Sequence, residues 1–127
     1  MTDERLNNFT QDWHWDKESE SFAMKLGRFL LEFVDEMKDS GLSRSTVSKY
    51  TDVSWCIGIL ICGYGYHDSF DIQTLFGSPY TNHDYEFRRK YSCSKNDLAY
   101  YPRTWRKLHK YAVKKGLASP YVDDEDE

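Results

Sequence analysis

The sequence predicts an all-α protein, a single compact bundle of four or five helices with mobile termini. Apolar residues recur at spacings of three and four in the segments 20–40, 43–64 and 102–115, as on the buried face of a helix. The length of 127 residues fits one domain, since single domains are commonly about 100–150 residues long. A chain of this length can bury about two-thirds of its unfolded surface, so it needs no metal or disulfide to fold. Aromatic residues make up 17% of the chain, and their large rings supply much of the buried area.

The first strong helix is expected over residues 20–40. Ser19 or Ser21 is the predicted N-cap, and Gly41 is expected in the left-handed conformation just past the end. The apolar stripe of this helix consists of Phe22, Leu26, Phe29, Leu30, Phe33, Val34 and Met37. Residues 1–18, which are rich in acidic and aromatic side chains, are predicted to form a mobile segment ahead of the domain.

A second helix is expected from Ser43 to Tyr64, ended by Gly63 and Gly65. The alternative is a buried strand over residues 53–61, which are rich in β-forming side chains. We favour the helix because the helical spacing continues for about 20 residues, whereas strands average about 5–6.

The segment between residues 66 and 102 contains weaker signals. A short helix over 69–77 would end at Gly77, and another would begin after Asn82. Ser94 has the spacing of an N-cap and would start a turn that runs to Tyr101.

The last helix is expected to begin at Pro102, because proline suits a first helical turn. Gly116 is the predicted C′ residue, followed by Leu117 as a hydrophobic contact. Pro120 ends the helical domain, which we place at residues 19–120, and an acidic tail follows over 121–127. The apolar face of the helix consists of Trp105, Leu108, Tyr111 and Ala112.

Charge is divided unevenly along the chain, although the net charge is only −4. The span from Arg88 to Lys115 holds ten basic residues and one acidic residue, Asp97, while the remainder holds 7 basic and 20 acidic residues. Such asymmetry is typical of a nucleic-acid contact or of an electrostatic contact with an acidic partner.

The last helix gathers much of this positive charge on one side. At 100° per residue, four basic residues fall within about 60° of one another, with Arg106 beside them. The four are Arg103, Lys107, Lys110 and Lys114. Such a ridge suits a phosphate backbone, where each neutralised phosphate releases counterions. The alternative is an ordinary solvated face, but such faces usually interleave Glu with Lys, and this one does not.

Three segments together resemble a known family. Residues 29–34 read Phe-Leu-Leu-Glu-Phe-Val, and residues 41–50 read Gly-Leu-Ser-Arg-Ser-Thr-Val-Ser-Lys-Tyr. Residues 103–117 read Arg-Thr-Trp-Arg-Lys-Leu-His-Lys-Tyr-Ala-Val-Lys-Lys-Gly-Leu. The pattern is similar to the N-terminal core-binding domain of tyrosine recombinases, the phage integrases, and covers about residues 22–120. The resemblance implies a bundle of four or five helices that clamps DNA.

The resemblance also implies a set of DNA-facing residues at the start of the second helix. These are Arg44, Ser45, Thr46 and Lys49. The recombinase catalytic domain has no counterpart here, and no histidine is followed three residues later by arginine. The chain is therefore expected to be no enzyme.

The sequence gives little indication of a metal site, a reactive thiol or a catalytic His-Asp pair. Cys56 and Cys62 lie six apart in an apolar helix, which does not suit a zinc site, and we expect Cys93 to be a plain thiol. The pairs 67–68 and 83–84, each His-Asp, are interpreted as surface groups. No cofactor motif, signal peptide or membrane span is recognised, so we expect a cytoplasmic protein without cofactor or membrane contact.

Trp13 and Trp15 leave two interpretations open: an exposed pair that anchors a protein partner, or rings that cover the core. Two functions follow from the sequence. The first is a non-catalytic DNA-binding module that grips phosphate without sequence-specific readout. The alternative is an interaction or regulatory adaptor whose basic span meets an acidic protein.

Overall fold

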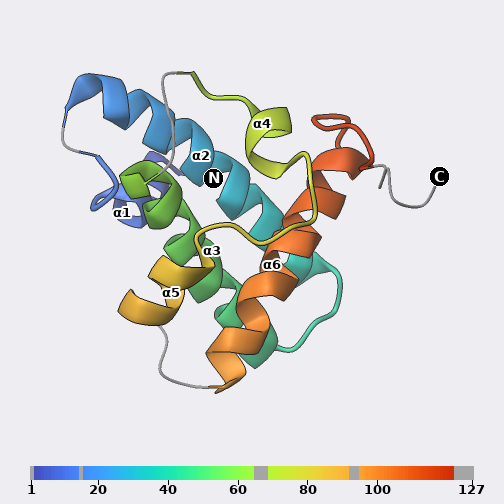
Figure 1. Ribbon diagram of the computed structural model, residues 1–127. Helices are drawn as coiled ribbons and strands as arrows, with labels where there is room; N and C mark the ends of the chain where they lie inside the picture. The colour runs from blue at the N-terminus through green and yellow to red at the C-terminus, as the bar shows by residue number, and fades with distance from the viewer. Residues whose placement is uncertain (1, 15, 65–68, 92–94, 122–127) are drawn as a thin grey trace.

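A computed structural model describes residues 2–14, 16–64, 69–91 and 95–121 (Figure 1). These residues form six helices and no strand, which confirms the all-α class with more helices than the four or five expected. The helices are α1 (Asp3–Thr10), α2 (Lys17–Asp39), α3 (Arg44–Tyr64), α4 (Ile72–Phe76), α5 (Asp84–Lys90) and α6 (Lys95–Lys114).

Helices α2 and α3 form the centre of the bundle and are joined by a tight turn. Gly41 in this turn has φ +88°, the left-handed conformation expected after the end of α2. The start of α2 differs from the prediction, because Asp16 and not a serine is the N-cap. The Asp16 carboxylate accepts a 2.8 Å hydrogen bond from the Ser19 N–H, and the Ser19 hydroxyl accepts one from the Asp16 N–H. This reciprocal capping box sets the start of α2 at Lys17.

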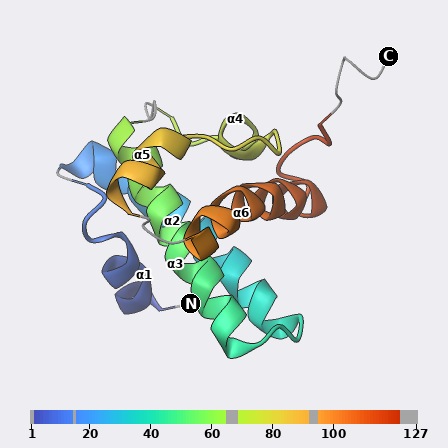
Figure 2. The same ribbon diagram turned by 60° about the horizontal axis from the view of Figure 1, so that its bottom comes forward.

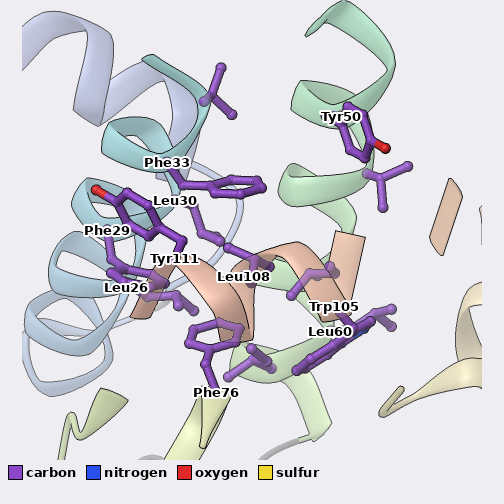
Figure 3. Packing of buried hydrophobic residues seen from close by; sticks show 14 of the residues in the cluster. Leu26, Phe29, Leu30, Phe33, Tyr50, Leu60, Phe76, Trp105, Leu108 and Tyr111 are labelled. Atoms are coloured by element: carbon purple, nitrogen blue, oxygen red, sulfur yellow. The ribbon is translucent and has the colours of Figure 1, made fainter. Parts of the chain in front are cut away.

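Helix α3 is helical throughout residues 53–61, so the strand alternative is wrong. It packs against α1, α2, α5 and α6, and Figure 2 shows it between α1 and α6. The close view in Figure 3 shows how α6 completes the core: Leu108 and Tyr111 point toward the aromatic side of α2, and Trp105 lies beside Leu60 of α3. The ring of Tyr111 lies 5.3 Å from that of Phe29, centroid to centroid.

The N-terminal residues differ from the mobile segment predicted for 1–18. Residues 3–10 form helix α1, which packs against α2 and α3 through Leu6 and through Trp13 in the turn that follows. Arg5 donates two 2.9 Å hydrogen bonds to the Asp35 carboxylate of α2. Because Leu6 and Trp13 are 2% and 1% exposed, this region belongs to the packed core. The sequence signal was weak, since a short helix offers few periodic positions.

The region before α6 follows the prediction in part. The two short helices occur as α4, ended by Gly77, and α5, which follows His83 rather than Asn82 as its N-cap. Ser94 lies outside the described residues. The Tyr101 hydroxyl donates a 2.5 Å hydrogen bond to the Asn82 carbonyl, which ties the loop before α5 to α6.

Helix α6 is longer than predicted, because it begins at Lys95 and continues through Pro102. Proline is unfavourable inside a helix, so the sequence argued for a start at this residue. The end agrees with the prediction: Gly116 has φ +73°, and the Leu117 N–H donates to the Ala112 carbonyl at 2.9 Å. The Gly116 N–H donates to the Val113 carbonyl at 3.0 Å, which completes a Schellman motif.

Candidate nucleic-acid interface

The exposed side of α6 carries the basic residues that the sequence placed there. Its opposite side is buried through Trp105, Leu108, Tyr111 and Ala112, as predicted. We call the exposed residues the basic face; they are Arg103, Arg106, Lys107, Lys110 and Lys114. From Arg103 to Lys114, which lie 11 positions apart, α6 advances about 16 Å. Duplex DNA presents roughly ten phosphates over that length of its axis.

The C-terminal end of the basic face is tied to α2. Glu36 accepts a hydrogen bond from Lys114, and its other carboxylate oxygen lies 3.3 Å from the Lys115 ammonium. The contact with Lys114, more than that with Lys115, lowers the pKa of Glu36. The sequence predicted that Lys114 would be available to phosphate, but in the structure Glu36 already compensates much of its charge.

The other four members of the basic face lack a carboxylate within 4 Å among the residues that the structure describes. Two of them are held by aromatic rings. The Lys107 ammonium lies 5.5 Å from the centre of the Tyr50 ring on α3, and the Arg103 guanidinium lies 5.5 Å from the Tyr100 ring. Cation–π contacts position a charge and leave it available to an anion.

Asp97 is the one acidic residue in the span 88–115, and it pairs outside the basic face. Lys49 of α3 donates a 2.7 Å hydrogen bond to the Asp97 carboxylate, and this contact raises the pKa of Lys49. Lys49 thus lies beside the start of α6, as it must if α3 and α6 are to contact the same DNA. Its charge, however, is already partnered.

The other predicted DNA-facing residues at the start of α3 do not all face the same surface. The Ser43 hydroxyl accepts a 3.2 Å hydrogen bond from the Thr46 N–H and donates one of 2.9 Å to the Thr46 hydroxyl, so Thr46 belongs to the helix cap. Ser45 is exposed. Arg44 lines a separate hollow of about 370 Å³ with Lys38 and Asp52. The predicted set is therefore not one continuous row.

A feature that the sequence did not predict lies beside the basic face. A groove of about 230 Å³ runs between the end of α2, the α2–α3 turn and α6. Phe33, Met37 and Tyr111 line its base, and Lys107, Lys110 and Lys114 line its rim. We call it the lysine groove. The helical periodicity predicted that Phe33, Met37 and Tyr111 belong to the core. It did not indicate that a groove would remain at the edge of that core.

Trp13 does not form the exposed anchor that was one of its two interpretations. Its ring is buried against Phe9, with centroids 5.1 Å apart, which is the core-covering alternative. Trp15 lies outside the described residues. The proposed Trp13/Trp15 partner site is therefore wrong for its first member.

Reactive groups are few in the described ranges. Burial raises the pKa of the Cys56 thiol to about 11 and that of Cys62 to about 12, so neither is a ready nucleophile. Burial also lowers the pKa of His83, and the neighbouring Asp84 lies 3.0 Å from Arg88. Cys93, His67 and Asp68 lie outside the described residues. Within those ranges no group of three His, Cys, Asp or Glu gathers as a metal site, and no helix is long and apolar enough to cross a membrane.

No protein-family model, no curated protein and no solved structure matches this chain.

Proposed function

We propose that the protein is a non-catalytic DNA-binding module that grips the phosphate backbone with the basic face of α6, in the manner of the core-binding domains its sequence resembles. One observation carries the proposal. Arg103, Arg106, Lys107 and Lys110 are exposed in a row on one helix and have no carboxylate partner among the described residues.

An unpaired basic row is suited to a polyanion because its charges are not already compensated. Each phosphate that it neutralises releases condensed counterions, and this gain is the same for every DNA sequence. The groups on the row are guanidinium and ammonium donors held on a rigid helix, which supports contact with phosphate oxygens. The proposal therefore assigns backbone binding and no base readout.

Titration of fluorescein-labelled duplex DNA by anisotropy, at several salt concentrations, tests the proposal. Log affinity of the wild type should fall linearly with log salt. In the double variant Arg103→Gln, Arg106→Gln, the slope should shrink by about 1.8, since each lost phosphate contact removes about 0.9. Both side chains are exposed, so circular dichroism should show an unchanged fold.

The matched control is Lys25→Gln, Arg28→Gln, which makes the same change in net charge, from −4 to −6. These two residues are exposed on α2 and line a hollow with Leu6 and Phe70, and no residue of the basic face lines that hollow. The control should bind DNA as the wild type does. Equal losses in the two variants, or wild-type binding that does not depend on salt, would contradict a specific role for the basic face.

The second candidate function is an adaptor that binds an acidic protein. The lysine groove favours it, because the apolar base of the groove has no use in contact with a phosphate backbone. An acidic chain that also carries an apolar side chain would use both the rim and the base.

A further inference from the structure

The lysine groove combines an apolar surface with a positively charged one. Its base is apolar, formed by Phe33, Met37 and Tyr111, and its rim carries three ammonium groups. Glu36 is the one acidic residue that lines it, and Glu36 is occupied by Lys114 and Lys115. Lys107 and Lys110 face no carboxylate among the described residues. The rim therefore presents free positive charge above an apolar base.

Leu42 extends the apolar part of the groove to the surface. It lies in the turn after Gly41, and its side chain is 40% exposed. Leu42 lines both the lysine groove and the neighbouring hollow that contains Arg44 and Lys38. A ligand that fills the groove would cover the exposed part of this leucine, which is favourable because apolar surface is removed from water.

The volume of the groove limits what it accepts. Small-molecule and cofactor sites usually enclose about 300–1,000 Å³, and the lysine groove holds about 230 Å³ and is open to one side. One large apolar side chain fits such a volume, with the rest of its chain lying across the rim. This is the arrangement of an anchored peptide.

We propose that the lysine groove binds an acidic segment of another protein, which inserts one large apolar side chain onto Met37 and Tyr111 and places carboxylates against Lys107 and Lys110. Charge complementarity selects the occupant: an acidic chain satisfies the rim, and its apolar anchor satisfies the base. Duplex DNA would satisfy only the rim. The site shares Lys107 and Lys110 with the proposed DNA contact, whereas Arg103 and Arg106 do not line the groove.

The probe is a fluorescein-labelled peptide of glutamates with a single central phenylalanine, titrated by anisotropy with the full chain at physiological salt. The wild type should bind it, and a peptide with alanine in place of the phenylalanine should bind about tenfold more weakly. Leu42→Ser should also weaken binding about tenfold, because about 1.4 kcal/mol of apolar burial is lost. Leu42 is exposed, so this variant should fold.

Charge variants separate this proposal from DNA binding. Lys107→Gln, Lys110→Gln should weaken peptide binding strongly, whereas Arg103→Gln, Arg106→Gln should weaken it less, since the two arginines do not line the groove and act on its ligand only through their charge. Leu42→Ser should leave DNA binding unchanged. These variants therefore show separately whether the DNA-binding proposal or the peptide-binding proposal fails.

Three results would overturn the inference. One is equal binding of the phenylalanine and alanine peptides, which would show a purely ionic contact. Another is a parallel loss of DNA and peptide binding in Leu42→Ser, which would assign the groove to DNA. The third is peptide binding that appears only after residues 123–127 are deleted, which would make the chain's own acidic run the occupant.

Discussion

The indole ring of Trp13 lies against the backbone of Gly58, with no space between them for a side chain. A Cβ built at Gly58 would lie 2.0 Å from Cη2 of Trp13, closer than real contacts allow. The same ring lies near Gly27 of α2, where a Cβ would lie 3.7 Å from its Cζ3. Gly58 thus forms the close contact with the tryptophan, and Gly27 leaves room for Thr10, whose Cγ2 would lie 2.3 Å from a Cβ built there. The two contacts fasten the N-terminal region to the α2–α3 pair.

Replacing Gly58 by alanine should destabilise the fold by about 1–3 kcal/mol, because the added methyl overpacks the site beside Trp13. Helix propensity acts the other way, since alanine is favoured over glycine by about 1 kcal/mol within a helix. Gly63 in the same helix is the matched control: a Cβ added there would meet nothing within 4 Å, so Gly63→Ala should be neutral or stabilising. Urea denaturation compares the two, and equal effects would contradict the close packing of Trp13.

Pro102→Ala should stabilise the protein by about 2 kcal/mol. Proline inside a helix costs about 3 kcal/mol. Part of the gain is lost, because alanine raises the conformational entropy of the unfolded chain and so stabilises the unfolded state by about 0.4–1 kcal/mol. Pro79, in the loop after α4, is the control: its replacement by alanine restores no helical hydrogen bond and should be slightly destabilising. Free energies of unfolding from denaturant titration test both. If Pro102→Ala brings no gain, α6 begins at this proline, as the sequence alone suggested.

Arg5 should control the titration of Asp35. Its hydrogen bonds hold the pKa of the Asp35 carboxyl below the ordinary value, so the pair contributes stability above the unfolded pKa. That contribution is lost as the pH falls through the lowered pKa. Both side chains are over a third exposed, so the gain is at most about 1 kcal/mol. Carboxyl NMR should show a higher pKa for Asp35 in Arg5→Gln and no change in Lys25→Gln.

Deleting residues 123–127 should tighten DNA binding. The deletion removes five negative charges and changes the net charge from −4 to +1. The gain should be largest at low ionic strength, where screening is weakest. This prediction depends on charge alone, since these residues lie outside the described ranges. A variant with Asn and Gln in their place keeps the length and should behave like the deletion; unchanged affinity at every salt would exclude competition by the acidic run.

Local patterns in the sequence were sufficient to predict the long helices and the sides they bury. The periodicity over 20–40 and 43–64 and the glycines at 41 and 116 are signals that act along one helix at a time. They predicted the apolar face of α6 and, with it, the exposure of Arg103, Lys107 and Lys110. Position on a helix was enough for these assignments.

Which side chains meet is a property of the folded molecule, because contacts between helices depend on how the helices cross. The fold pairs Lys49 with Asp97 and ties Lys114 to Glu36, so the free charge on α6 is concentrated in its middle. It also buries Trp13 against Gly58, a residue that no periodicity in the sequence connects with it. The lysine groove exists for the same reason: α6 crosses the end of α2 and leaves the edge of the core open beside its lysines.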